Sequence, residues 1–214
     1  MNLAGFVPLS LCDYPGRVAA VIFTQGCNFR CPWCHNGHLL PLTADPSKRV
    51  SEEQVLAVLE KRRTRLGGVV ISGGEPTLQP ALPRFLRCLK ALGLDVKLDT
   101  NGSHPNVLRQ LLADRLLDYV AMDVKAPWHK YATLTGMACC DVASVQASMA
   151  LIAASGLPHA FRTTRVDPLL SEQEYGDIRM QIPKGSLHTW QAFCPAYSHD
   201  PALRSASGKA VAAR

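Results

Sequence analysis

The chain has 214 residues, of which 47% are hydrophobic, and a formal net charge of +6. That length suits one domain with a sizeable core, and no apolar stretch is long enough to cross a membrane. Because the amino terminus does not resemble a signal peptide and the basic residues are scattered, we expect a cytoplasmic protein that binds neither membranes nor nucleic acid.

The first elements can be predicted from local patterns. Residues 1–17 are expected to be irregular and to end in the turn Asp13-Tyr14-Pro15-Gly16. Residues 18–24 form a short apolar run rich in β-branched residues, which predicts a buried strand. Residues 37–50 contain glycine and prolines and indicate a loop. From there, helices are predicted over 51–63, 82–92, 107–116, 142–154 and from Ser171, and strands over 69–72, 95–98, 119–122, 159–164 and 187–193.

This alternation predicts an α/β fold with about six βα units in one parallel sheet. A closed barrel of eight units usually needs about 250 residues. The chain is shorter, so we expect an open, partial (βα)6 barrel. Residues 1–197 form the predicted domain, and residues 198–214, which lack periodic apolar positions, are predicted to be a loose tail.

Three cysteines follow the first predicted parallel strand. Cys27, Cys31 and Cys34 have the spacing C-x3-C-x2-C, and thiolates this close converge on one metal centre. A [4Fe–4S] cube normally takes one cysteine per iron, so three ligands leave one iron free to bind something else. A structural zinc site with His35 competing as ligand is the alternative, although the second half of a typical zinc motif is missing. The remaining cysteines lack metal spacing; they are Cys12, Cys88, Cys139, Cys140 and Cys194.

Polar clusters follow three further predicted strands. The carboxyl ends of parallel strands meet at one edge of a sheet, so these clusters outline a pocket together with the cysteines. Each cluster alone could be an ordinary turn, helix cap or surface ion pair. Arg162, inside a predicted strand, needs a polar partner if buried and could line the pocket or form a salt bridge. The clusters are Gly73-Gly74-Glu75, then Asp99 with Asn101, then Asp123-Val124-Lys125.

The cysteine array resembles the cluster loop of the radical S-adenosylmethionine (SAM) enzymes. The ending Trp33-Cys34-His35 looks like the branch that activates glycyl radical enzymes. Three further segments resemble the activating proteins of anaerobic ribonucleoside-triphosphate reductases: Phe6-Val7-Pro8-Leu9-Ser10, Asp13-Tyr14-Pro15-Gly16 and Phe23-Thr24-Gln25-Gly26-Cys27. The likeness covers nearly all of residues 6–194.

This resemblance implies one [4Fe–4S] cluster held by the three cysteines, and SAM bound beside it. Family members with extra clusters carry a cysteine-rich insert, which this chain lacks. The resemblance implies that Gly73, Gly74 and Glu75 bind the methionine part of SAM and that Lys125 contacts its carboxylate. Contacts with SAM or a cation are implied for Asp99 and Asp123, with Asn101 and Val124 beside them, and Trp33, Cys34 and His35 are placed next to SAM.

The implied activity is reductive cleavage of SAM, followed by formation of a glycyl radical on a partner enzyme. The resemblance points to an anaerobic ribonucleotide reductase as partner and to a flavodoxin-like or ferredoxin-like electron donor. Two alternatives remain open at this point. One is a radical SAM enzyme that acts on a small molecule, and the other is a non-catalytic metal-binding module.

Overall fold

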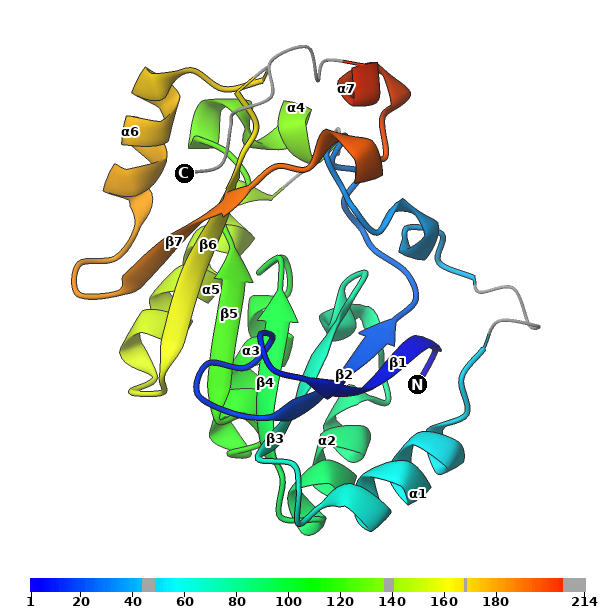
Figure 1. The fold of residues 1–214 in the computed structure, drawn as a ribbon. Coiled ribbons are helices and arrows are strands. Elements are labelled where there is room, and N and C mark those ends of the chain that lie inside the picture. The colour runs from blue at the N-terminus through cyan, green and yellow to red at the C-terminus, as the bar shows by residue number, and fades with distance from the viewer. Residues whose placement is uncertain (44–48, 137–140, 168, 206–214) are drawn as a thin grey trace.

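The computed structural model describes residues 1–43, 49–136, 141–167 and 169–205. The predicted α/β fold is confirmed. Seven strands form one sheet in chain order (Figure 1), with β1 antiparallel to β2 and the others parallel. Because β1 and β7 do not pair with each other, the barrel is open between them. The strands are β1 Leu3–Ser10, β2 Ala19–Thr24, β3 Gly68–Gly73, β4 Asp95–Thr100, β5 Tyr119–Asp123, β6 His159–Arg165 and β7 Leu187–Ala192.

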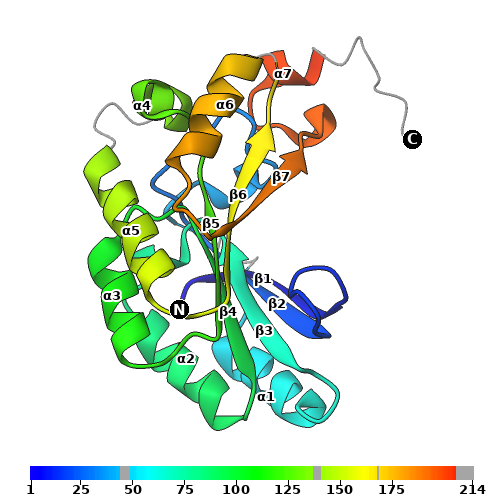
Figure 2. The same ribbon diagram turned by 90° about the vertical axis from the view of Figure 1, so that its left-hand side faces the viewer.

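The longer helices pack against one face of the sheet (Figure 2), where their apolar side chains share one core with the strands. Their positions agree with the predicted helices to within a few residues, and Ser171 caps α6 through a full capping box with Glu174. The longer helices are α1 Glu52–Arg62, α2 Leu82–Ala91, α3 Pro105–Ala113, α5 Val142–Ala154 and α6 Glu172–Gln181. The shorter ones are η1 Gly37–Leu39, η3 Pro76–Leu78, η4 Trp128–Lys130, α4 Tyr131–Thr135, η5 Pro195–Tyr197 and α7 Pro201–Ser205.

The prediction that residues 1–17 are irregular is wrong for β1. This strand contains Gly5 and Pro8, which mask a strand signal, and its pairing with β2 is interrupted by two register shifts. Proline lacks an N–H donor and is tolerated in strands at a sheet edge or a bulge. As an edge strand with irregular pairing, β1 provides such a place.

Alternation along the strands separates an apolar outer face from a partly polar inner face. On β4, Val96 and Leu98 lie in the core under the helices, while Lys97 and Asp99 point the other way. Near the amino ends of the strands the inner face is closed by a small apolar cluster of Tyr14, Ala19, Val21 and Val70. A cavity lies on the inner face beyond this cluster, at the carboxyl ends of the strands.

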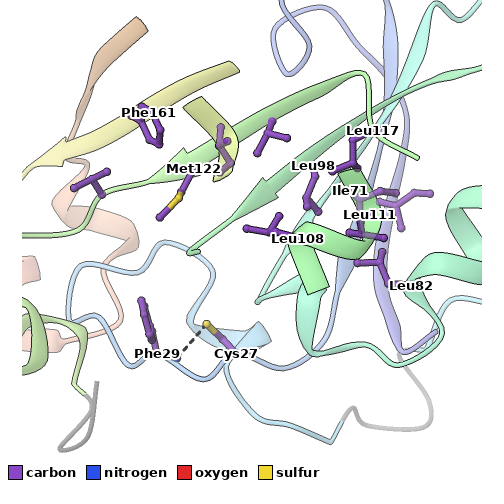
Figure 3. Packing of buried hydrophobic residues seen from close by; sticks show 14 of the residues in the cluster. Cys27, Phe29, Ile71, Leu82, Leu98, Leu108, Leu111, Leu117, Met122 and Phe161 are labelled. Carbon is purple, nitrogen blue, oxygen red and sulfur yellow. Dashed lines mark hydrogen bonds between the residues drawn. The ribbon is translucent and has the colours of Figure 1, made fainter. Parts of the chain in front are cut away.

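The main core extends from the helices up to the cysteine loop. Figure 3 shows Cys27 and Phe29 at one end of this core and the leucines of α2 and α3 at the other. In the described residues, no helix is long and apolar enough to span a membrane. The carboxyl-terminal part differs from the loose chain expected there, because residues 201–205 form α7 and Leu203 is buried in the main core. Residues 206–214 and the pair Cys139-Cys140 lie outside the described residues.

Candidate functional site

The three cysteines line one cavity of about 230 Å³ at the carboxyl ends of the strands. Cys27 and Cys31 are buried, Cys34 is partly exposed, and all three are free thiols. The predicted clusters after β3, β4 and β5 meet the cysteines there, as the parallel topology requires. The lining consists of Cys27, Phe29, Cys31, Trp33, Cys34, His35, Asn36, Leu40, Ser72, Gly73, Gly74, Asp99, Thr100, Asn101, Asp123, Lys125, Arg162, Thr164 and Gln191.

Backbone hydrogen bonds fix the start of the cysteine loop. The Gly26 N–H donates to the Leu39 carbonyl over 2.8 Å, and the Cys27 N–H donates to the Leu40 carbonyl over 3.2 Å. Farther along, the Arg30 N–H donates to the Thr135 carbonyl over 2.6 Å. The Phe29 N–H also donates to the Cys27 sulfur, at 3.4 Å (Figure 3). An N–H directed at sulfur favours the thiolate that a metal ligand must provide.

The paired glycines at the end of β3 allow the backbone there to pack directly against the start of the cysteine loop. A Cβ atom at Gly74 would lie 2.1 Å from the Gly26 carbonyl oxygen, and Gly73 has a positive φ of 116°. In return, the Glu75 N–H donates to the Gly26 carbonyl over 2.8 Å. Both glycines line the cavity, but the close approach that demands glycine is to the protein's own backbone.

Glu75 is not among the residues that line the cavity, and its implied contact with SAM stays a prediction. Its carboxylate is fully buried and accepts hydrogen bonds from the Thr77 N–H and hydroxyl, from the Thr100 hydroxyl, and from the Asn101 N–H at 2.6 Å. Burial raises the pKa of Glu75, whereas these hydrogen bonds oppose the rise. The carboxylate therefore ties the turn after β3 to the turn after β4.

Five charged side chains from β4, β6 and the end of β5 form a ladder on the inner face of the sheet. Lys97 contacts Asp99 at 2.5 Å, and the Arg162 guanidinium bridges Asp99 at 3.3 Å and Asp123 at 2.8 Å. Lys125 contacts the other oxygen of Asp123 at 2.9 Å. Both aspartates are thus paired with lysine or arginine side chains. Their charge is balanced without the separate cation that the resemblance allows as a contact.

The ladder fixes the charge of its members. Burial alone would raise the pKa of Asp123, but Arg162 and Lys125 outweigh it and hold this pKa well below its usual value. Burial alone would lower the pKa of Lys125, and the carboxylate of Asp123 raises it instead. Lys125 is therefore a permanently charged ammonium group on the wall of the cavity, 20% exposed.

The cysteines suit a positively charged inorganic centre. Burial raises the pKa of Cys27 to about 11 and that of Cys31 to about 12, so thiolates at these positions need a cationic partner. A metal centre would be such a partner by binding the thiolates. Among the described residues, no three His, Cys, Asp or Glu side chains are arranged to hold a single metal ion. A [4Fe–4S] cluster takes one thiolate per iron, so its ligands do not have to meet at one point.

The other predicted site residues are divided between the cavity and the core. Trp33 and Asn101 are buried and line the cavity, and the Asn101 amide donates to the Asn28 side chain over 2.9 Å. His35 lies at the exposed rim. Val124 is buried in the main core under the helices and does not reach the cavity.

Several lining residues were missed by sequence reasoning. Ser72, Thr164 and Gln191 lie on β3, β6 and β7, within or at the edge of segments predicted as strands rather than in the turns after them. The alternation of side chains along each strand could have identified them. Thr164 is two residues beyond Arg162 and so shares its face, and Ser72 follows Val70 in the same way.

A family model described as the radical SAM superfamily matches residues 21–178. The chain belongs to the radical SAM superfamily. Membership implies a [4Fe–4S] cluster and SAM, and the cavity has free thiols and a cationic wall to fit both. The cysteine loop lies inside the matched segment.

Curated relatives narrow the family. A protein of Methanocaldococcus jannaschii named "Putative glycyl-radical enzyme activating enzyme MJ1227" is 34% identical over 92% of this chain and 82% of its own length. The pyruvate formate-lyase-activating enzyme of Staphylococcus epidermidis is 38% identical over 44% of this chain and 39% of its own. The 7-carboxy-7-deazaguanine synthase of Methanopyrus kandleri is 34% identical over 54% of this chain and 52% of its own. The protein is thus a homologue of glycyl-radical-enzyme activating enzymes.

Solved structures show the same fold at low identity. The Streptococcus suis SuiB structure with its precursor peptide SuiA superimposes with a TM-score of 0.65 at 14% identity, over 83% of this chain. A structure titled anSMEcpe with bound AdoMet gives a TM-score of 0.60 at 15% identity, over 79% of this chain. This chain spans 40% and 49% of the lengths of those two proteins.

Proposed function

We propose that this protein is the activase of a glycyl radical enzyme, and that its partner is an anaerobic ribonucleoside-triphosphate reductase. The observation that carries the activase proposal is a cavity with three free thiols on one side and a charged ladder on the other. It occurs in a chain that matches a named glycyl-radical-enzyme activating enzyme over nearly all its length. The reductase is supported by the likeness of residues 6–10, 13–16 and 23–27 to activators of that class.

Cys27, Cys31 and Cys34 would hold a single [4Fe–4S] cluster. When bound, that cluster supplies the electron that splits SAM into methionine and a 5′-deoxyadenosyl radical, which takes a hydrogen atom from a glycine of the partner. The cysteines provide three of the four ligands a cube needs, so the fourth iron is left to SAM. No second group of cysteines with metal spacing occurs in the sequence, which supports one cluster per chain.

Lys125 would bind the carboxylate of SAM. Its ammonium group lines the cavity, and Asp123 holds it in place from behind. Arg162 pairs with the other carboxylate oxygen of Asp123 and so neutralises part of its negative charge. Lys125 is therefore left with positive charge to attract the SAM carboxylate. Asp99 and Asn101 complete the polar wall, and Trp33 and His35 lie on the side of the cysteine loop.

The chain's own residues would also exclude water. Phe29, Trp33 and Leu40 line the cavity with apolar surface next to the cysteines. Exclusion of water protects a reactive radical from side reactions. The open edge between β1 and β7 leaves the sheet unclosed, which suits a substrate that arrives as a loop of another protein.

The electron donor would be flavodoxin-like or ferredoxin-like, and the protein would work in the reducing cytoplasm. Reduced thiols are required at the site, and the cysteines that the structure describes are all free. This part of the proposal rests on the chemistry of the family.

Electron spin resonance tests the proposal directly. The reconstituted protein is incubated under anaerobic reducing conditions with SAM and the partner reductase. A glycyl radical doublet on the partner is expected, and it should be absent with Cys34→Ala. Formation of 5′-deoxyadenosine without any partner radical, together with stoichiometric consumption of a small molecule, would refute the activase proposal.

That outcome would favour the second candidate function, a radical SAM enzyme acting on a small molecule. One observation supports this candidate, namely the partial match to 7-carboxy-7-deazaguanine synthase. The match covers about half of each chain, whereas the activating-enzyme match covers nearly all of this one. We therefore place it second.

A further inference from the structure

The chain that follows β7 does not leave the molecule but crosses to the cysteine loop. We call residues 193–204 the C-terminal strap. In Figure 1 it runs in orange and red from the end of β7 over the top of the open barrel toward the loop that follows β2. The strap thus links the end of β7 to the loop that follows β2.

Two N–H groups of the strap donate hydrogen bonds to the second half of the cysteine loop. The Asp200 N–H donates to the Pro32 carbonyl over 2.8 Å. The Cys194 N–H donates to Nε2 of His35 over 3.3 Å. The strap thus supplies hydrogen bonds to Pro32 and His35, whereas the Asn36 and Gly37 carbonyls accept from the Leu39 and Leu40 N–H groups.

Ring contacts add to these bonds. The His35 ring stacks on Phe193 with centroids 6.0 Å apart and planes inclined by 20°, and it meets Tyr197 edge-on at 6.4 Å. On the other side of the loop, Gly37 lies against His199 so closely that a Cβ atom would be 2.7 Å from Nδ1 of His199. The strap therefore touches the residues just before and just after Cys34.

The strap is itself ordered by internal contacts. Ser198 is fully buried, its hydroxyl donates to the Asp200 carbonyl over 2.8 Å, and its own carbonyl accepts from Arg204 Nε over 2.8 Å. Leu203, 7% exposed, belongs to the main core that also contains Cys27 and Cys31. A segment anchored in the core at one end can hold a surface loop at the other.

We propose that the C-terminal strap is a positioning element for the third cysteine. It holds residues 32–37 so that Cys34 faces the cavity and completes the three-thiolate site. The importance of this position rests on the proposed cluster, but the contact itself can be tested in the metal-free protein. Residues 32–36 form turns between β2 and η1 and belong to no helix or strand, so contacts from the strap can decide where Cys34 points.

Gly37 and His199 offer a reversible way to break the contact. Gly37→Ala introduces a Cβ atom against the His199 ring, and Gly37 has no positive φ that would strain an alanine. His199→Ala in the same chain removes the ring and so the closest contact, leaving the His199 Cβ at 3.3 Å. Gly176→Ala in α6 is the matched control, because nothing lies within 4 Å of its Cβ position.

The main readout is the alkylation rate of each cysteine in the metal-free protein, measured by mass spectrometry. Gly37→Ala should speed alkylation of Cys34 by about tenfold, the effect of losing one hydrogen bond's net contribution. Cys27 should react as in the unchanged protein. Adding His199→Ala should return Cys34 to its original rate, and Gly176→Ala should have no effect. In the reconstituted protein, the iron lost to a chelator should follow the same order.

Three results would overturn the proposal: an unchanged Cys34 rate in Gly37→Ala, an equal rise at Cys27 and Cys34, or no recovery in the double variant. Thermal unfolding checks that each variant folds. If Gly37→Ala does not fold, Leu203→Ala replaces it, because it releases the anchor of the strap and should also expose Cys34 selectively. Failure of the activase proposal would leave the alkylation pattern intact, so the two proposals fail separately.

Discussion

The two halves of the cysteine loop carry the same kind of ligand but are held in different ways. The first half, residues 26–31, is hydrogen-bonded to the end of η1 and the residue after it, to the turn after β3 and to α4. Its two cysteines are buried in the main core. The second half, residues 32–37, lies nearer the surface, and the strap donates hydrogen bonds to Pro32 and His35. The difference shows that one cysteine motif can combine a half buried in the core with a half whose position depends on residues distant in the sequence.

The largest expected effect, loss of the cluster, should be the same for cysteines in either half of the loop, because all three thiolates are needed. Cys27→Ala, Cys31→Ala and Cys34→Ala should each abolish the cluster, since loss of one ligand leaves a cube with two protein thiolates. Iron and sulfide analysis after anaerobic reconstitution measures this. Cys88→Ala is the control and should keep its cluster. A cluster that survives Cys31→Ala would show that the ligand assignment is wrong.

Glu75→Ala should lower the stability of the fold next to the first half of the loop. Removing the buried carboxylate leaves donors of Thr77, Thr100 and Asn101 without a partner. The expected loss is roughly 3 kcal/mol or more of unfolding free energy, because each buried unsatisfied group costs about 1–3 kcal/mol. Thermal unfolding should show a midpoint lower by about 10 °C, at about 2–4 °C per kcal/mol in a domain of this size.

Glu75→Gln retains the shape of the side chain and one acceptor oxygen, so its midpoint should fall between those of Glu75→Ala and the unchanged protein. If Glu75→Ala unfolds at the normal temperature but binds SAM poorly, the carboxylate is a ligand after all. In that case the turn after β3 would contact the cofactor through Glu75 as the family resemblance implied.

Lys125→Ala should weaken SAM binding and leave the cluster intact. The substitution removes a charge-assisted contact worth roughly 1.5–3 kcal/mol, or about tenfold or more in affinity. Equilibrium binding of SAM to the reconstituted protein measures the change. Lys61→Ala on the exposed surface of α1 is a matched control and should bind SAM normally. Unchanged affinity in Lys125→Ala would place the SAM carboxylate elsewhere.

Arg162→Lys should have the smallest effect. Lysine keeps the positive charge but not the planar fork with which Arg162 bridges Asp99 and Asp123. SAM affinity should fall less than in Lys125→Ala, because Lys125 loses only a support and not its own charge. A loss larger than that of Lys125→Ala would mean that Arg162 contacts SAM directly.

The sequence was sufficient to predict the parallel sheet and the ring of turns at its carboxyl edge. Alternating apolar runs and turn residues repeat along the chain, and parallel topology places the ends of β2 to β5 together. The cysteine spacing then indicated the cluster loop of the radical SAM enzymes, a superfamily to which the chain belongs. These inferences succeed because each depends on local patterns of a few residues.

Contacts between distant segments could not be predicted in the same way. Glu75 resembled a ligand because it follows two glycines, but the sequence did not reveal that its carboxylate accepts hydrogen bonds from Thr77, Thr100 and Asn101. Residues 198–205 resembled a tail because they lack apolar periodicity. The strap is held by backbone donors such as the Asp200 N–H and by the single apolar anchor Leu203. Neither feature leaves a periodic signal in the sequence.

The central claim is that three thiolates from the two halves of the loop hold one cluster whose fourth iron is left to SAM. Mössbauer spectroscopy of the reconstituted protein, with and without SAM, tests it most directly. We expect about four iron and four sulfide ions per chain, with SAM changing the signal of a single iron. A site that takes up zinc without sulfide, or a cluster in which SAM leaves every iron signal unchanged, would contradict the claim.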